Sequence, residues 1–407
     1  MKILFVVHDF FPKFFGGTER YVLNMAKQMQ RMGNNVKVFT YGVADPPDAF
    51  SSQNNILYRT YFFEGIPVIC IRHKEIPPDQ GYRISDDILE DVVNILKTER
   101  PDVIHVAHPM RLSAVISAAQ LVGIALVLTI TDFWLLCIRG RFFKPDYSLC
   151  NSPENGEKCK LQCYADDSIF ERNKKAKELF DSVDVRVAPS RFLIEIFRAN
   201  KWDKPIHHIN HGVDYSYVKP IQRMRRPGEP VILAYMGVVS RFKGIDLLLS
   251  SFKKVKESNI RLHIYGNCVG DDGTIDLVRE AEIEDMRIKN MGQFSHDDLP
   301  HILNQVDIIV TPSTTLESYG LVVTESLSYG VPVIASDVVG SAYEFIRNGE
   351  NGLIFPMHNQ TELVEIIKKI SEQPSLINTL KANITLPPRL EEEAFLVEKM
   401  YKSVLHK

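Results

Sequence analysis

The sequence predicts an α/β protein made of two doubly wound domains with parallel sheets. A chain of 407 residues exceeds what one hydrophobic core usually supports. Short apolar runs typical of buried parallel strands alternate with helical stretches in residues 1–214, and a second alternation follows in residues 231–389. Residues 219–230 contain three prolines and four basic residues without an apolar period, so we expect a linker over residues 215–230. The two domains are expected to face a central cleft.

The composition excludes some classes of function. The chain is 45% hydrophobic and 24% charged with a net charge of −3, which describes an ordinary globular protein and gives no reason to expect nucleic-acid binding. The first apolar run ends at His8, too early for a signal peptide. Gly123 divides the most apolar long stretch, residues 114–130, into a helix and a strand. We therefore expect a cytoplasmic protein without transmembrane helices, whose six cysteines are reduced.

The first half begins with an expected strand at residues 2–7, an aromatic loop, the pair Gly16 and Gly17, and a helix that ends at Gly33. Such a glycine pair lets the backbone approach a phosphate, although a tight turn explains the same residues. Further strands are expected at residues 36–40, 102–106, 126–131, 185–188 and 207–210, and helices before Gly123 and at residues 192–197. A last helix at about residues 390–407 is expected to pack back on this half.

Two features of the first half are compatible with contact to an anionic membrane surface. Phe10, Phe11, Phe14 and Phe15 form a loop that can touch a lipid or an apolar substrate, unless they are core residues. Residues 172–177 form a basic helix face that suits anionic headgroups. Charge pairs along a solvated helix explain the same residues, so both alternatives stay open.

Four of the six cysteines lie close together in the sequence. They are Cys137, Cys150, Cys159 and Cys163. A structural zinc site with four thiolate ligands is one hypothesis for them, although the spacing is not that of a CxxC pair. Buried thiols without a ligand are the alternative.

In the second half, cations follow the first expected strand. The strands of this half are expected at residues 232–237, 262–265, 308–310 and 331–335, and the helices at residues 246–255, 275–281 and 320–330. Arg241 and Lys243 come directly after the first of these strands, at the edge of a parallel sheet where cations can meet a phosphate. A charged surface turn is the simpler alternative.

The loop after the strand at residues 308–310 carries Glu317, and the following helix carries Glu325. Backbone N–H groups of Gly320, Leu321 and Val322 at the start of that helix suit a phosphate. The two carboxylates would repel a phosphate and therefore more plausibly accept hydrogen bonds from hydroxyl groups. A ligand with phosphates between two polyhydroxy ends fits this pattern. A solvated loop glutamate and a surface helix glutamate are the alternative, which the spacing alone favours.

In these residues the chain resembles the retaining glycosyltransferases of the GT-B fold, family four (glycosyl transferases group 1), which have two Rossmann-like domains. The matching segments occur in order along nearly the whole chain: GGTE at residues 16–19, TDFWLLC at 131–137, APS at 188–190, HGVD at 211–214, KG at 243–244, and the two glutamates with GLVVTESLSYGVPVIASD. Each segment is short, but six in register make the resemblance specific.

The resemblance implies a donor site for a nucleoside diphosphate sugar in the second half. Glu325 would hold the ribose hydroxyls and Glu317 the hydroxyls of the transferred sugar. Gly320, Leu321 and Val322 would donate backbone N–H groups to the sugar and the distal phosphate. No DxD motif occurs, and Lys243 and Arg241 would neutralise the leaving diphosphate, so no metal or other cofactor is expected for catalysis.

The resemblance also implies roles in the first half, with two departures. Gly16 and Gly17 would close over the diphosphate. Many relatives have a His-Asp pair where this chain has Thr131 and Asp132, so Asp132 remains a catalytic candidate and His108 is expected to substitute for the histidine. Many relatives also have an arginine after Gly237, where this chain has Val238, and Arg241 is expected to serve instead.

The expected function is retaining transfer of a sugar to a glycan or lipid-linked glycan, in bacterial surface polysaccharide biosynthesis. The enzyme would be cytoplasmic and would meet the inner face of the cell membrane. A non-catalytic relative that binds nucleotide sugars as a partner subunit is one alternative. A sugar nucleotide epimerase on the same fold is another.

Overall fold

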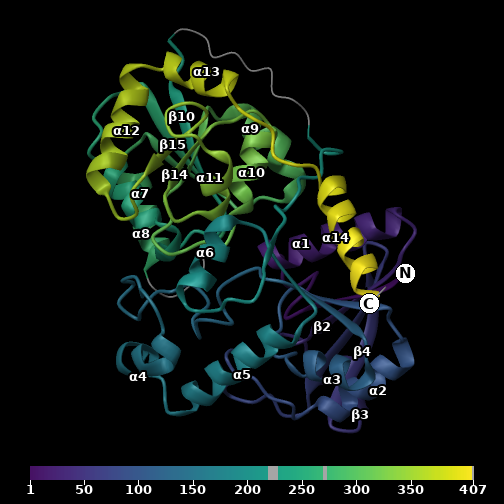
Figure 1. The fold of residues 1–407 in the computed structure, drawn as a ribbon. Helices are drawn as coiled ribbons and strands as arrows, with labels where there is room; N and C mark the ends of the chain where they lie inside the picture. Colours follow the sequence, from purple (N-terminus) through teal and green to yellow (C-terminus); the bar gives the residue numbers. More distant parts are fainter. Residues whose placement is uncertain (219–227, 269–272, 406–407) are drawn as a thin grey trace. The chain divides into compact units, whose positions relative to one another are not determined.

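The computed structural model describes residues 1–218, 228–268 and 273–405, and it divides into two compact units. Unit 1 comprises Met1–Gly212 and Leu390–Lys407, and unit 2 comprises Val213–Arg389. Each unit is an α/β structure around one sheet, as Figure 1 shows, so the predicted fold class of two doubly wound domains is confirmed. Most of the expected linker, residues 219–227, lies outside the described residues.

The sheet of unit 1 has nine strands in the order β3-β4-β5-β2-β1-β6-β7-β8-β9. Their bounds are β1 Lys2–Val7, β2 Asn35–Tyr41, β3 Ser51–Gln53, β4 Ile56–Phe63, β5 Ile66–His73, β6 Val103–Val106, β7 Ala125–Thr129, β8 Val185–Ala188 and β9 His207–His208. Strands β5, β2, β1 and β6 to β9 run parallel. Strand β1 is buried from Ile3 onward, which explains why its sequence is a continuous apolar run.

Strands β3, β4 and β5 form an antiparallel edge that the sequence analysis did not predict. Strands β4 and β5 are joined by Glu64 and Gly65, which both have positive φ angles, 46° and 80°. Two such residues give a tight hairpin turn whose twist matches that of the strands. The sequence features that indicate this hairpin are the aromatic and β-branched residues of β4 and the glycine of the turn.

The helices of unit 1 cover this sheet. They are α1 Gly17–Arg31, η1 Pro47–Ala49, α2 Leu89–Glu99, α3 Ala114–Val122, η2 Glu154–Gly156, α4 Glu157–Cys163, α5 Ser168–Ser182, α6 Arg191–Ala199 and α14 Leu390–Leu405. Helix α6 begins where the Ser190 hydroxyl accepts a hydrogen bond from the Leu193 N–H, and α3 ends at Gly123, which takes the left-handed conformation.

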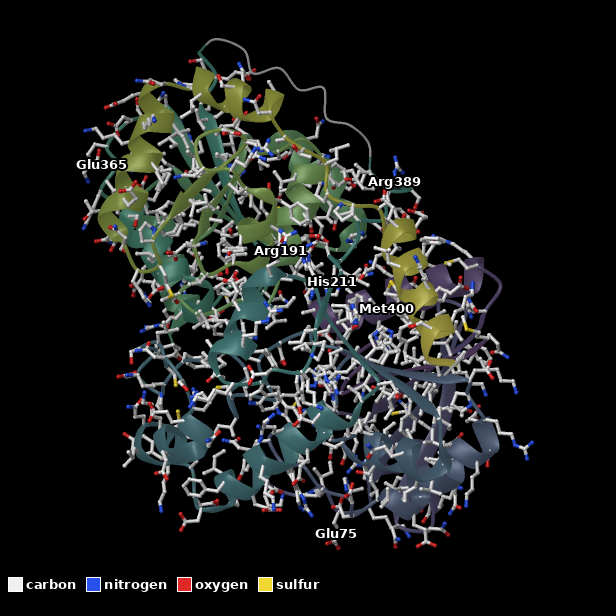
Figure 2. The ribbon with its side chains drawn as sticks, in the orientation of Figure 1. Glu75, Arg191, His211, Glu365, Arg389 and Met400 are labelled. Atoms are coloured by element: carbon white, nitrogen blue, oxygen red, sulfur yellow. The ribbon has the colours of Figure 1, made fainter. Side chains whose placement is uncertain are left out.

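The C-terminal helix α14 completes the core of unit 1, where it packs against α1 (Figure 1). The Glu393 carboxylate accepts hydrogen bonds from the Gly212 N–H at 2.7 Å and pairs with His211 Nδ1 at 2.9 Å. Figure 2 shows His211 beside α14, which carries Met400. Tyr401 at the far end of the helix hydrogen-bonds with the buried His105. Polar contacts at both ends therefore fix the register of α14 on the sheet.

The sheet of unit 2 is entirely parallel, with strand order β12-β11-β10-β13-β14-β15. Its strands are β10 Val231–Met236, β11 Ile260–Tyr265, β12 Ile288–Gly292, β13 Ile308–Thr311, β14 Val333–Ser336 and β15 Leu353–Phe355. Its helices are η3 Arg241–Lys243, α7 Ile245–Phe252, α8 Thr274–Glu284, η4 His296–Asp298, α9 Leu299–Gln305, α10 Leu321–Ser328, α11 Gly340–Phe345, α12 Gln360–Glu372 and α13 Ser375–Ala382. Apolar clusters lie on both faces of the sheet.

Both sheets contain a point where the chain reverses the direction in which strands are added. In unit 1 this point lies between β1 and β6, and in unit 2 it lies between β10 and β13. The loops that leave such neighbouring strands diverge to opposite faces, which opens a crevice at the carboxyl edge of the sheet. The loops after these four strands therefore hold the best-placed residues for binding a ligand.

The predicted basic helix face at residues 172–177 is wrong in part. Arg172 points inward, where its guanidinium donates to the Leu135 and Trp134 carbonyl oxygens and stacks on the Trp134 ring. Burial lowers its pKa to about 10. Lys175 and Lys177 pair with acidic residues one turn away on the same helix, α5. These pairs match the alternative of a solvated, internally paired helix.

No helix in the described ranges is long and apolar enough to cross a membrane. The sequence left two alternatives open for the phenylalanines of the aromatic loop, namely contact with a lipid or apolar substrate and packing in the core. The structure shows some of them in the core and one exposed. Phe10 and Phe11 are buried core residues, Phe14 is half-buried, and Phe15 is 56% exposed.

Replacing Glu393 with alanine should destabilise unit 1 by roughly 3 kcal/mol, because the substitution leaves a buried N–H group and a buried imidazole without their partner. Urea unfolding followed by tryptophan fluorescence measures this directly, since both tryptophans, Trp134 and Trp202, belong to unit 1. Glu392 is exposed on the same helix, and Glu392→Ala should change the unfolding free energy by less than about 0.5 kcal/mol. Equal effects of the two variants would contradict the anchoring role.

Candidate active site

The loops after β10 and β13 bring the predicted residues of unit 2 together. Lys243 Nζ lies 2.6 Å from Glu317 Oε2, although 74 positions separate the two residues in the sequence. The other carboxylate oxygen, Oε1, accepts a hydrogen bond from the Ser313 hydroxyl. Lys243 keeps 30% and Glu317 13% of its side chain exposed. An ammonium and a carboxylate thus meet at the switch point of the sheet, still open to solvent.

The backbone holds Glu317 in this position. Its N–H donates to the Val338 carbonyl at 2.9 Å, and its own carbonyl accepts from the Gly340 N–H at 3.0 Å. These bonds join the loop after β13 to the loop after β14. The carboxylate therefore sits on a braced segment rather than on a free loop.

Gly244 is required for the close approach of the two loops. It has a φ of +78°, and a Cβ atom there would lie 1.8 Å from the Pro312 carbonyl oxygen. A side chain at this position would push the loop of Lys243 away from the loop of Glu317. The position thus needs a glycine for both conformation and space.

Helix α10 begins at Leu321, after Gly320 in the left-handed conformation. The first N–H groups of a helix have no partner inside it, and the half-buried Leu321 and Val322 contribute two of them. Glu325 stands one turn further along with 21% of its side chain exposed, and its Oε1 lies 3.9 Å from His296 Nδ1. Anion-binding and hydroxyl-binding groups therefore follow each other along one short helix.

Arg241 differs from Lys243 in its surroundings. It lies in η3 with an exposed side chain and makes no ion pair among the described residues. The Arg241 guanidinium is therefore free to meet an anion. Val238, which stands where many relatives have an arginine, is 42% exposed, and its carbonyl accepts a hydrogen bond from the Tyr235 hydroxyl.

In unit 1, the loops after β1, β6 and β7 form a second polar cluster. His108 Nε2 lies 2.9 Å from Asp132 Oδ2, and the His108 ring contacts the His8 ring with centroids 4.1 Å apart. Burial alone would raise the pKa of Asp132, but His108, the Trp134 N–H and Arg141 outweigh it and hold the pKa below its usual range. The two candidate residues His108 and Asp132 are therefore brought together.

Three further members of this cluster were missed by sequence reasoning. His8, Asp9 and Glu19 lie beside one another, with His8 Nε2 3.5 Å from Glu19 Oε1 and Arg111 2.9 Å from Asp9 Oδ1. Burial raises the pKa of Glu19 to about 7, and burial together with His108 and Arg111 lowers the pKa of His8. His8 is therefore uncharged near neutral pH, and about half of Glu19 is protonated at pH 7. Their sequence signals were the end of β1 for His8 and Asp9, and the GGTE segment at the start of α1 for Glu19.

The glycine pair leads directly into this cluster. Gly16 precedes α1, and Gly17 is its first residue. A Cβ atom at Gly16 would lie 2.7 Å from Glu19 Oε2. Because about half of Glu19 is protonated at pH 7, it opposes an anion at the start of α1 less than a fully ionised carboxylate would.

The six cysteines are free thiols in the structure, and Cys137, Cys150 and Cys159 are buried. The described residues contain no cluster of three or more His, Cys, Asp or Glu side chains arranged to hold a metal ion. Burial raises the pKa of the Cys159 thiol to about 12. The described residues therefore do not form the four-thiolate zinc site considered for these cysteines.

Comparisons with protein families cover nearly all of the chain. Residues 15–217 match the family model described as Glycosyltransferase Family 4, and residues 220–385 match the model described as Glycosyl transferases group 1. A D-inositol 3-phosphate glycosyltransferase of Mycobacterium leprae is 25% identical over 375 residues, which cover 84% of this chain and 77% of that protein. The chain spans only 46%, 37%, 36% and 50% of the length of the first four curated relatives it matches.

Solved structures are similar over the whole chain. Sucrose-phosphate synthase from Thermosynechococcus elongatus has a TM-score of 0.74 and 18% identity, covering 100% of this chain and 99% of that one. HepE of Anabaena in complex with UDP-glucose has a TM-score of 0.69 and 18% identity, covering 99% and 100%. At this identity the likeness shows the fold alone, which is the GT-B fold.

The raised pKa of Glu19 makes stability depend on pH. A glutamate titrates near 4.5 in the unfolded chain and near 7 here, so its contribution is present below pH 4.5 and is lost as pH rises through 7. Between pH 5 and pH 8 the wild-type chain should lose roughly 2 to 3 kcal/mol relative to Glu19→Gln, which mimics the protonated acid. Urea unfolding at both pH values, followed by tryptophan fluorescence, measures the difference.

A matched control is Glu178→Gln, at an exposed position on α5. This variant should follow the pH dependence of the wild type. If Glu19→Gln also follows it, then Glu19 is not the titrating group.

Proposed function

The chain belongs to the glycosyltransferases described by these two family models, and on this premise we propose that it is a retaining enzyme that uses a nucleoside diphosphate sugar. The acceptor is a glycan or a lipid-linked glycan, in the synthesis of a bacterial surface polysaccharide. In this proposal the enzyme is cytoplasmic, which agrees with its free thiols. It works at the inner face of the membrane. The HepE structure with UDP-glucose supports this class of donor.

The observation that carries the proposal is the pairing of Lys243 with Glu317 beside the start of α10. A cation and helix N–H groups suit a diphosphate, and two carboxylates suit hydroxyls on either side of it. We assign Glu317 to the hydroxyls of the transferred sugar and Glu325 to the ribose. An ammonium carries three N–H donors, so Lys243 can hold Glu317 and a phosphate oxygen together.

The proposed chemistry follows from where charge develops. As the bond between the anomeric carbon and the phosphate oxygen breaks, negative charge grows on the departing diphosphate. Lys243, Arg241 and the N–H groups of Leu321 and Val322 stabilise this charge more in the transition state than in the ground state, which accelerates the reaction. The acceptor hydroxyl attacks from the face that the phosphate leaves, which retains configuration, and its proton passes to the leaving phosphate.

Unit 1 supplies the acceptor side in this proposal. Gly16 and Gly17 let the backbone approach the diphosphate. His108 holds Asp132, whose side chain is 38% exposed and whose carboxylate can accept hydrogen bonds from hydroxyl groups. The polar cluster at the end of β1 lies on the same edge of the sheet. These groups orient the acceptor, because nothing in the proposed chemistry requires a side-chain nucleophile.

A non-catalytic subunit that binds a nucleotide sugar is the second candidate. Thr131 favours it, because this residue donates its hydroxyl to the Ala107 carbonyl at 2.9 Å and so cannot replace a histidine that touches the sugar. The paired Lys243 and Glu317 favour catalysis. A nucleotide sugar that binds without release of its sugar would favour the subunit.

Nucleoside diphosphates should stabilise the chain against heat. A ligand at about 100 times its dissociation constant adds roughly 2.7 kcal/mol to the folded state. UDP, GDP, ADP and TDP should be compared by thermal denaturation, with UDP as the first choice because of the HepE complex. Glu325→Ala should reduce the stabilisation. No stabilisation by any of the four would remove the donor assignment.

Lys243→Gln should slow release of the diphosphate from the matching sugar nucleotide by about 100- to 1000-fold, because it removes a charge that acts on the leaving group. Water can serve as acceptor in this assay. Lys253→Gln is the control, since Lys253 pairs with Glu284 in the same unit at 2.6 Å and should leave the rate unchanged. A rate for Lys243→Gln within threefold of the wild type would refute the proposed role.

A further inference from the structure

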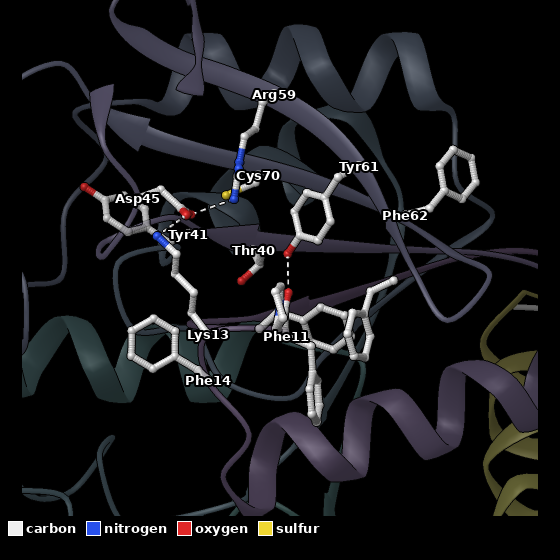
Figure 3. Close-up of a pocket in the computed structure, with 13 residues that line it drawn as sticks. Phe11, Lys13, Phe14, Thr40, Tyr41, Asp45, Arg59, Tyr61, Phe62 and Cys70 are labelled. Carbon is white, nitrogen blue, oxygen red and sulfur yellow. Dashed lines mark hydrogen bonds and ion pairs between the residues drawn. The ribbon is translucent and has the colours of Figure 1, made fainter. Parts of the chain in front are cut away.

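A pocket of about 310 Å³ opens in unit 1, between the loop that follows β1 and the antiparallel edge of the sheet (Figure 3). Its walls come from that loop and from strands β2, β4 and β5. It shares the β1–α1 loop with the glycine pair. The pocket therefore lies next to the groups assigned above to the acceptor side, without including any of them.

Aromatic rings form most of the walls. Phe11 and Phe63 stack with centroids 4.8 Å apart, and the Tyr61 hydroxyl donates to the Phe11 carbonyl at 2.8 Å. These contacts hold the rings in place before any ligand arrives. Phe62 at the same pocket is 75% exposed. Phe63 and Arg20 lie against the Phe11 ring, and Arg59 lies over the Tyr61 ring. The exposed Phe62 is therefore the ring best placed to meet the apolar C–H face of a ligand ring.

The side chains that line the pocket carry more positive than negative charge. Asp45 pairs with Lys13 at 2.8 Å and with Arg59 at 2.7 Å, so one carboxylate faces two cations (Figure 3). Among the lining residues the charge is therefore positive by one. The buried Arg72, which does not line the pocket, donates to the Asp45 backbone carbonyl. The Cys70 thiol stays neutral, because burial raises its pKa to about 11. The excess positive charge favours an anionic ligand over a neutral or cationic one.

Two polar atoms at this pocket have no hydrogen-bond partner among the described residues. They are the Thr40 hydroxyl, in a residue only 2% exposed, and Arg59 Nε. An unpaired buried polar atom is costly and calls for an explanation. Arg59 Nε can only donate, and a hydroxyl can donate or accept. A ligand that carries several oxygen atoms would satisfy both.

We propose that this pocket binds an acidic sugar residue of the acceptor, a pyranose ring that bears a carboxylate. Phe62 takes the C–H face of the ring, Thr40 and Arg59 bond its oxygen atoms, and the excess positive charge meets its carboxylate. The inference rests on the proposed function for its role in transfer and names the class of acceptor. Binding to the pocket itself depends only on unit 1.

The test uses the full chain and three small probes: methyl β-D-glucuronide, methyl β-D-glucoside and methyl 2-amino-2-deoxy-β-D-glucoside. Titrations followed by saturation-transfer NMR should give the tightest binding for the glucuronide and the weakest for the amino sugar. Equal binding of all three, or a preference for the amino sugar, would overturn the proposal.

Thr40→Val and Phe62→Ala locate the binding. The valine has the shape of threonine, and the hydroxyl that it removes has no partner in the part of the chain that the structure describes, so the fold should be unchanged. Each variant should weaken glucuronide binding roughly three- to tenfold. Phe395→Ala, at a 61% exposed phenylalanine of α14 in the same unit, should leave it unchanged. Glucuronide binding that neither pocket variant alters would place the ligand elsewhere and overturn the proposal.

Nucleotide binding separates this inference from the proposed function. Glu325→Ala lies in unit 2 and should bind the glucuronide as the wild type does. A chain that UDP stabilises but that does not bind the glucuronide would overturn the pocket assignment alone. A chain that binds the glucuronide through Thr40 and Phe62, but no nucleoside diphosphate, would support the pocket and remove the proposed transfer.

Discussion

The direction of the strands is the constraint on which the rest of this structure depends. When neighbouring strands run parallel, the loops that leave them emerge at one edge, and residues far apart in the sequence meet there. Lys243 and Glu317 meet in this way after β10 and β13, and His8 and His108 after β1 and β6. The sheets therefore do more than form cores, because their strand order decides which side chains become neighbours.

The two polar clusters handle buried charge differently. In unit 2 the ammonium of Lys243 and the carboxylate of Glu317 balance each other while both keep some exposure to solvent. In unit 1, Glu19 and His8 are more deeply buried. The pKa of Glu19 is raised and that of His8 is lowered, and both shifts favour the neutral form. A charged pair is ready to exchange a partner for a ligand, whereas neutral groups can donate and accept hydrogen bonds without repelling one. The first arrangement suits a diphosphate, and the second suits hydroxyl groups.

Sequence reasoning succeeded where a residue follows a buried parallel strand. The apolar runs of β10 and β13 are clear, so the positions of Lys243 and Glu317 followed from them. It failed where contacts depend on three-dimensional packing. Arg172 belongs to a basic run in the sequence, but only the fold shows that it turns inward to backbone carbonyl groups. Strand β4 is only partly buried, so its pattern is weak, and the pocket beside it could not be foreseen.

Helix α14 has a consequence for how the chain is made. Unit 1 takes its core from residues 1–212 and from the last helix, while unit 2 is continuous in the sequence between them. During synthesis, the apolar surface of α1 that α14 covers stays uncovered until α14 leaves the ribosome, after all of unit 2. The second half can fold earlier, as a unit in itself. Unit 1, whose synthesis begins before that of unit 2, is therefore completed after it.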